Sequence, residues 1–129
     1  MKSINRYIDH AVLKPEMTRD DAAAAIKLGI EHDTRTVCVR PCDIELAITL
    51  CQGTATDVST VLAFPHGATH SRSKIAEAEI FAELEVTEVD MVANYGLIRS
   101  KDWSDFETDI KGVFNILSPK GIILKVILE

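Results

Sequence analysis

Apolar and polar residues alternate along this chain in two patterns. Short runs rich in apolar residues, typical of buried strands, are separated by segments in which apolar residues recur every three or four positions, as on one face of a helix. The predicted strands cover residues 7–13, 36–39, 58–64, 88–93 and 122–128. The predicted helices begin near Thr18, after Pro41, near Ser71 and near Ser100. The pattern therefore predicts four strand–helix units followed by a fifth strand.

Local signals support the predicted helix ends. Thr18 with Asp21 three residues later forms a capping sequence for the first helix. The helix near Ser71 places Ile75, Ala78, Phe81 and Ala82 on its inward face. The last helix, predicted to run from about 100 to 117, has an inward stripe of Trp103, Phe106, Ile110, Val113 and Leu117.

Strands that alternate with helices pair in parallel through right-handed crossovers. Two architectures fit: a doubly wound open sheet or part of a (βα)8 barrel. The glycine-rich phosphate loop of a dinucleotide fold does not follow the first strand, so the barrel is slightly favoured. Because a complete barrel needs about 250 residues, the 129-residue chain is expected to be one domain, residues 1–129, that forms a half-barrel truncated after strand five.

Composition limits the expected binding partners and cellular compartment of the protein. A net charge of −6 argues against nucleic acid as a partner, because phosphate binding needs a basic surface. No run reaches the roughly 18 apolar residues of a membrane span, and the first residues lack the apolar core of a signal peptide. Three cysteines, Cys38, Cys42 and Cys51, match no zinc or disulfide spacing, so we expect buried or half-buried thiols in a cytoplasmic protein.

Charged residues within apolar strands are the main candidates for chemistry. Asp90 lies in the fourth predicted strand and Lys125 in the fifth. In a barrel both would face the interior from strands about 4.8 Å apart, where the carboxylate and the amine can pair. Two interpretations stay open: a buried ion pair that fixes strand register, or a proton-transfer pair. Asp9, in the first strand, is either a strand-end carboxylate or a second site residue.

The histidines do not suggest a metal site. His66 and His70 lie four residues apart, but a Pro-Gly turn separates them from a settled helix, and the sequence offers no further ligands nearby. We therefore expect no metal at these histidines.

Taken together, the segments resemble the deoxyribose-phosphate aldolases. The resemblance rests on five runs in the same order, which read IDHAVLKP at 8–15, VCVRP at 37–41, FPHGA at 64–68, EVDMV at 88–92 with Asn94 and Gly96, and LKVILE at 124–129. It covers this whole chain and the N-terminal half of the family's barrel. It implies a metal-free class I aldolase that reversibly cleaves 2-deoxyribose 5-phosphate to glyceraldehyde 3-phosphate and acetaldehyde through a Schiff base.

The resemblance also implies roles for four residues. Asp90 matches the family's proton-relay aspartate, and Lys125 matches the lysine beside it on strand five. Asp9 matches an aspartate near the substrate's hydroxyl end, and Cys38 a cysteine that lines the pocket. Ala11 departs from the pattern, since the family usually has a threonine there.

The most important departure from the family concerns its catalytic lysine. The family's Schiff-base lysine lies in a K-T-S-T-G type run on the sixth strand, and the sequence contains no such run. Three functions stay open: one half of a deoxyribose-phosphate aldolase that is inactive alone, a self-assembling half-barrel with a binding or other non-catalytic role, or an enzyme that uses Lys125 as its amine. The apolar concave face and the two edge strands of a half-barrel further predict a homo-oligomer.

Overall fold

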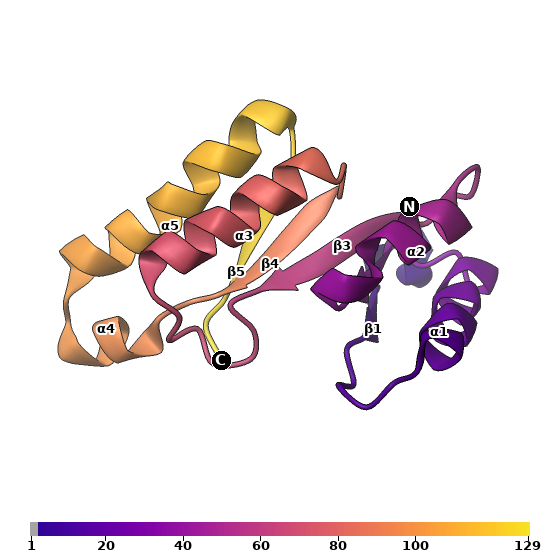
Figure 1. Cartoon of the computed structure of the whole chain (residues 1–129), viewed down its shortest axis with the longest axis horizontal. Coiled ribbons are helices and arrows are strands. Elements are labelled where there is room, and N and C mark those ends of the chain that lie inside the picture. The colour runs from indigo at the N-terminus through magenta and orange to yellow at the C-terminus, as the bar shows by residue number, and fades with distance from the viewer. Residues whose placement is uncertain (1–2) are drawn as a thin grey trace. The chain divides into compact units, whose positions relative to one another are not determined.

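The structure is a computed structural model that describes residues 3–129. Its strands are β1 (Asp9–Val12), β2 (Thr36–Val39), β3 (Asp57–Leu62), β4 (Glu88–Val92) and β5 (Ile123–Ile127). Its α-helices are α1 (Arg19–Glu31), α2 (Ile44–Cys51), α3 (Ser71–Glu83), α4 (Tyr95–Ser100) and α5 (Trp103–Leu117) (Figure 1). Short 3₁₀ helices cover Ile4–Tyr7, Pro41–Asp43 and Ser118–Lys120.

The strands form one sheet in sequence order, β1-β2-β3-β4-β5. The pairs β1–β2, β2–β3 and β4–β5 are parallel. Helices connect successive strands, as parallel pairing requires. The α/β fold with five parallel strands, predicted from the apolar pattern, is therefore confirmed.

The chain divides into two compact units, Met1–Thr60 and Val61–Glu129. In the first unit, Thr18 and Asp21 form the predicted capping box at the start of α1. Helix α1 packs closely on β2, because a Cβ on Gly29 would lie 2.6 Å from Cγ1 of Val37. The core of this unit is fully buried and consists of Val12, Ala22, Ile26, Val37, Val39, Ile44 and Ala47.

In the second unit, α3 and α5 lie side by side against one face of β4 and β5 (Figure 1). Val89, Met91 and Ala93 point to the helices and are fully buried. Glu88, Asp90 and Val92 alternate with them and point to the opposite face. The helices contribute Ala78, Phe81, Val113 and Leu117 to this core. The predicted placement of Asp90 on the face away from the helices is confirmed.

Two predicted elements need correction. The first strand does not begin at Tyr7, because Ile4–Tyr7 forms a 3₁₀ helix. The predicted helix from about 100 to 117 is two helices. Lys101 adopts a left-handed φ of 59°, which ends α4, and Asp102 then caps α5 by accepting from the Asp105 amide. Trp103 is therefore the first residue of α5 and is 57% exposed.

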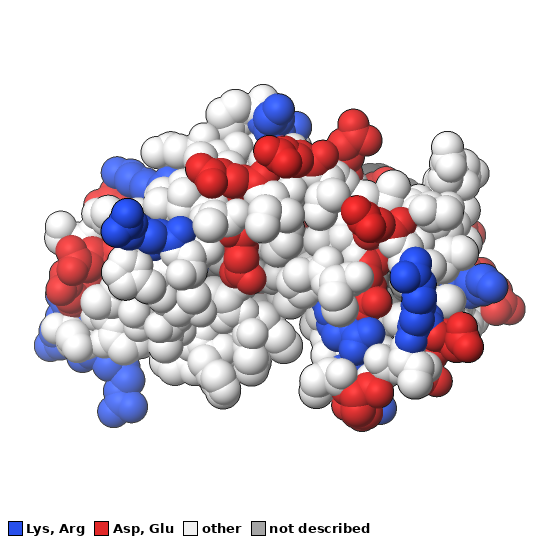
Figure 2. All heavy atoms as spheres, in the orientation of Figure 1, with Lys and Arg blue, Asp and Glu red and all other residues white. Residues whose placement is uncertain are grey.

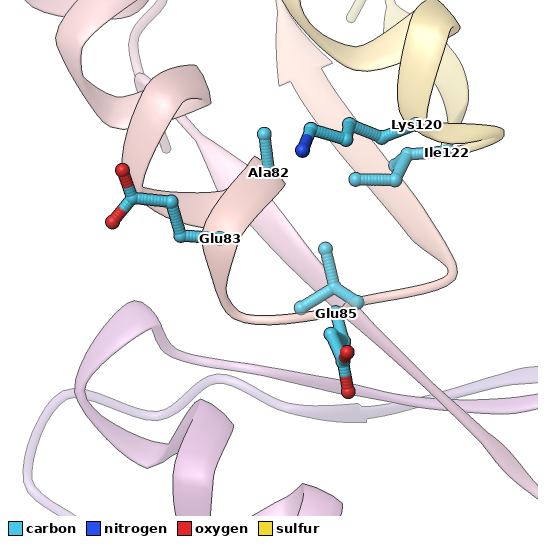
Figure 3. A pocket seen from close by; sticks show the side chains of 6 residues that line it. Ala82, Glu83, Glu85, Lys120 and Ile122 are labelled. Atoms are coloured by element: carbon cyan, nitrogen blue, oxygen red, sulfur yellow. The ribbon is translucent and has the colours of Figure 1, made fainter.

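A pocket of about 510 Å³ lies where the chain enters β4 and β5 (Figure 3). Its lining comes from the end of α3, the turn before β4 and the segment before β5, and includes Glu83, Glu85 and Lys120. The amino ends of the strands in a (βα)8 barrel serve stability, so this pocket is not the candidate active site.

On the face that Figure 2 shows, acidic and basic side chains are intermixed. No helix among residues 3–129 is long and apolar enough to cross a membrane.

Candidate active site

Strands β4 and β5 bring three charged side chains together. Their register places Asp90 directly opposite Lys125. The Lys125 Nζ lies 2.9 Å from Oδ1 of Asp90 and 3.2 Å from Oε2 of Glu88. One amine therefore pairs with two carboxylates that stand two residues apart on the same strand face. The predicted Asp90–Lys125 pair is confirmed, and Glu88 is its third member.

These groups differ in their access to solvent. The side chains of Glu88 and Asp90 are 8% and 15% exposed, whereas that of Lys125 is 36% exposed. Burial makes the two carboxylates depend on the amine for charge compensation. The partly open amine can still meet a small molecule. An acid and a base in direct contact, with one of them accessible, can pass a proton to a substrate.

In the first unit, hydroxyl groups hold Asp9. The Thr36 hydroxyl donates to Oδ1 of Asp9 at 2.7 Å, and Oγ of Ser59 lies 2.8 Å from Oγ1 of Thr36. Because the single hydroxyl proton of Thr36 points to Asp9, Ser59 is the donor to Thr36. Thr36 and Ser59 are fully buried. The chain of hydroxyls fixes the orientation of a carboxylate that remains exposed.

Cys38 pairs in register with Ala11 on β1 and Ser59 on β3, on the same face as Asp9. It is 4% exposed. Cys51 is also buried, and burial, together with the nearby charge of Asp57, raises the pKa of its thiol to about 11. Cys42 lies in the 3₁₀ turn before α2 and is exposed, so the expectation of three buried or half-buried cysteines is wrong for this residue.

Comparisons with known proteins connect this geometry to a family. The deoxyribose-phosphate aldolase of Thermotoga maritima is 37% identical over 129 residues, which are all of this chain and 51% of the relative. That of Finegoldia magna is 37% identical over 126 residues, 98% of this chain and 58% of the relative. This chain is homologous to the deoxyribose-phosphate aldolases.

Solved structures agree with the sequence comparison. A crystal structure of a candidate deoxyribose-phosphate aldolase from Coccidioides immitis superposes with a TM-score of 0.92 and 34% identity, covering 98% of this chain and 49% of that one. The aldolase QR15 gives a TM-score of 0.90 at 26% identity, covering 100% and 57%. No family model matches the chain. The chain spans about half the length of the curated deoxyribose-phosphate aldolases it matches.

Sequence analysis did not identify four buried polar residues that make side-chain contacts in the structure: Thr36, Ser59, Lys74 and Asp109. Lys74 and Asp109 form a buried ion pair between α3 and α5, with Nζ 2.6 Å from Oδ2 and side-chain exposures of 0% and 3%. The helical spacing contained a signal for this pair. Lys74 lies four residues before the inward Ala78, and Asp109 lies four residues before the inward Val113, so both charges fall on inward helix faces. Opposite charges on the inward stripes of adjacent helices indicate such a pair.

Asp109 also lines a pocket of about 400 Å³ beyond the carboxyl end of β4, together with Ser71, Asn94, Asp105 and Thr108.

His70 caps α3, since its Nδ1 accepts from the Arg72 amide at 3.2 Å. Among residues 3–129, no group of three or more His, Cys, Asp or Glu side chains is arranged to hold a metal ion.

Proposed function

We propose that this chain is part of a class I deoxyribose-phosphate aldolase, in which Asp90 and Lys125 move protons during the reversible cleavage of 2-deoxyribose 5-phosphate. One observation carries the proposal: an amine and a carboxylate 2.9 Å apart on adjacent strands, in a chain that is 37% identical along its whole length to such an aldolase. The proton-transfer interpretation is favoured over a purely structural pair because Lys125 is 36% exposed.

The reaction of a class I aldolase consists of a covalent step and several proton transfers, and this chain is proposed to supply the groups for the proton transfers. In a class I aldolase an amine condenses with the substrate aldehyde and releases water, which creates an electron sink. The bond between C2 and C3 then breaks, its electrons enter the sink, and the C3 hydroxyl loses a proton. The resulting enamine takes a proton at C2 before water releases acetaldehyde. We assign these proton movements to Asp90 and Lys125, and the covalent step to the lysine on the family's sixth strand.

Asp9 and Cys38 are proposed as substrate-binding residues. An exposed carboxylate that two buried hydroxyls hold in place is suited to accept a hydrogen bond from a sugar hydroxyl. Cys38 supplies a small apolar wall with a weak donor. The substrate class is a phosphorylated sugar, with no metal or other cofactor.

Complementation tests the proposal. The chain is mixed with a second polypeptide that carries strands six to eight of the Thermotoga maritima relative, and release of glyceraldehyde 3-phosphate is followed. We expect cleavage only in the mixture, and none when the added half has its Schiff-base lysine replaced by methionine. A mixture that assembles, as judged by co-elution, and yet leaves the substrate intact contradicts the proposal.

A second candidate function is self-assembly of the chain. Ile123 and Leu128 are 49% and 61% exposed at strand β5 and just after it, although apolar side chains there favour a covering surface. We propose a second copy of the chain as that cover, in a cytoplasmic homo-oligomer that binds no nucleic acid. Light scattering over a concentration series tests this, and a monomer throughout the series contradicts it.

A further inference from the structure

Helix α3 carries two charged side chains that reach the carboxyl ends of neighbouring strands. The Lys74 Nζ lies 3.4 Å from the carbonyl oxygen of Val92, the last residue of β4. One helical turn later, Oε2 of Glu77 accepts from the amide of Ala63, just after β3, at 3.0 Å. An amine therefore contacts the carbonyl at the end of β4, and a carboxylate accepts from the amide just after β3.

Asp109 from α5 completes the arrangement. Its Oδ2 accepts from Lys74 at 2.6 Å and its Oδ1 from the Ser71 hydroxyl at 2.7 Å. Both carboxylate oxygens of Asp109 and the amine of Lys74 are thus engaged. Such a pair is expensive to desolvate, and an apolar pair of similar volume stabilises a fold equally well or better. Overall stability alone does not explain why the pair is ionic.

The position of the pair supplies the explanation. Val92 follows Asp90 by two residues, and the next amide, that of Ala93, donates to Ile127 of β5 at 3.0 Å. The loop after β3 is tight against the same point, because a Cβ on Gly67 (φ 67°) would lie 2.1 Å from the Ala93 oxygen. Catalytic groups of (βα)8 enzymes gather at this end of the strands. The buried pair holds the backbone that carries Asp90.

We propose that Lys74 and Asp109 are positioning residues that fix the carboxyl end of β4 and thereby the orientation of Asp90 toward Lys125. This role deepens the proposed aldolase function and rests on it. The directional hydrogen bond from Lys74 to Val92 is the property that an apolar pair cannot reproduce.

The double variant Lys74→Met/Asp109→Leu separates positioning from stability, because it removes the charges together and keeps the volume. The variant Glu107→Leu/Lys111→Met makes the same kind of change at an exposed pair on α5 and is the control. Hydrogen exchange is measured at the amides of Ala93 and Val89, at the two ends of β4. The NMR signal of the Asp90 carboxyl carbon is recorded, with that of Asp21 as an internal reference.

We expect the double variant to keep the urea midpoint of the native chain, while exchange at Ala93 rises about tenfold and that at Val89 is unchanged. The Asp90 carboxyl signal should shift or split, whereas that of Asp21 stays in place. Unchanged exchange at Ala93, or an equal rise at both amides with a lowered midpoint, overturns the proposal. No substrate is present in these measurements, so their failure is distinct from failure of the aldolase function.

Discussion

A lysine–aspartate ion pair lies on each side of β4, and the two pairs differ in their exposure to solvent. On the helix side, Lys74 and Asp109 are 0% and 3% exposed and have further hydrogen bonds to Val92 and Ser71. On the other side, Lys125 and Asp90 are 36% and 15% exposed, and Glu88 adds a second carboxylate. The first pair is almost completely closed to solvent, although Asp109 borders the pocket beyond β4. The second keeps an accessible amine and an excess of negative charge.

The comparison teaches that burial and partner number, rather than residue type, separate a structural ion pair from a reactive one. A fully engaged pair holds its surroundings in one arrangement, because its charged atoms are occupied by protein partners. A pair that is partly solvated, with one amine shared between two carboxylates, presents a charged group that a small molecule can reach.

Trapping with borohydride asks whether the accessible amine is itself a nucleophile. The 129-residue chain alone, incubated with 2-deoxyribose 5-phosphate and borohydride, should give no stable adduct and no cleavage, because the Lys125 amine is engaged in ion pairs with Asp90 and Glu88. Mass spectrometry of the intact chain and its peptides checks this. An adduct on Lys125 would make the chain an enzyme in its own right.

Breaking the closed pair should destabilise the fold strongly. Lys74→Met leaves the buried Asp109 carboxylate without the amine and with only the Ser71 hydroxyl donating to it, which should lower the free energy of unfolding by about 3–5 kcal/mol. Urea denaturation measures this. A loss below about 1 kcal/mol would place this pair with ordinary surface pairs.

Breaking the open pair should have a smaller effect on the fold. Lys125→Met leaves the carboxylates of Glu88 and Asp90, 8% and 15% exposed, without the amine. Because the amine itself is 36% exposed and solvent reaches this side of the sheet, the loss should be about 1–2 kcal/mol, below that of Lys74→Met. Denaturation under the same conditions as for Lys74→Met gives the comparison. If the two variants are equally destabilised, exposure does not distinguish the pairs.

The exposed pair on α5 marks the lower end of the series. The Lys111 Nζ lies 2.7 Å from Oε1 of Glu107, and its hydrogen bond and charge hold the pKa of Glu107 below the ordinary value. Because the folded pKa is the lower one, this contribution is present above the unfolded pKa and is lost as pH falls through the folded pKa. Lys111→Met should return the Glu107 pKa to its ordinary value in an NMR titration and leave the denaturation midpoint unchanged.

Sequence patterning predicted the sheet and the Asp90–Lys125 pair because strand alternation has a period of two and both residues interrupt apolar runs. It missed the break at Lys101, since a left-handed residue other than glycine leaves no clear signal in a helical pattern. It also missed the ion pair of Lys74 and Asp109, because the two charges lie on different helices among polar neighbours such as Ser73 and Thr108, and their pairing depends on how α3 and α5 pack. The Asp9–Thr36–Ser59 contacts depend on the register of three strands at once, and hydroxyl residues do not stand out in a strand sequence as charged residues do.

The central claim is that Asp90, with Lys125, moves protons in an aldolase. Deuterium uptake by acetaldehyde from heavy water reports on this step most directly, because the enzyme exchanges the methyl protons through the enamine, and exchange through the free enol is measured without protein and subtracted. In the complemented barrel, Asp90→Asn should slow the uptake by about 100-fold while borohydride still traps acetaldehyde on the Schiff-base lysine. Uptake at the native rate in this variant, with trapping intact, would show that Asp90 does not carry the proton.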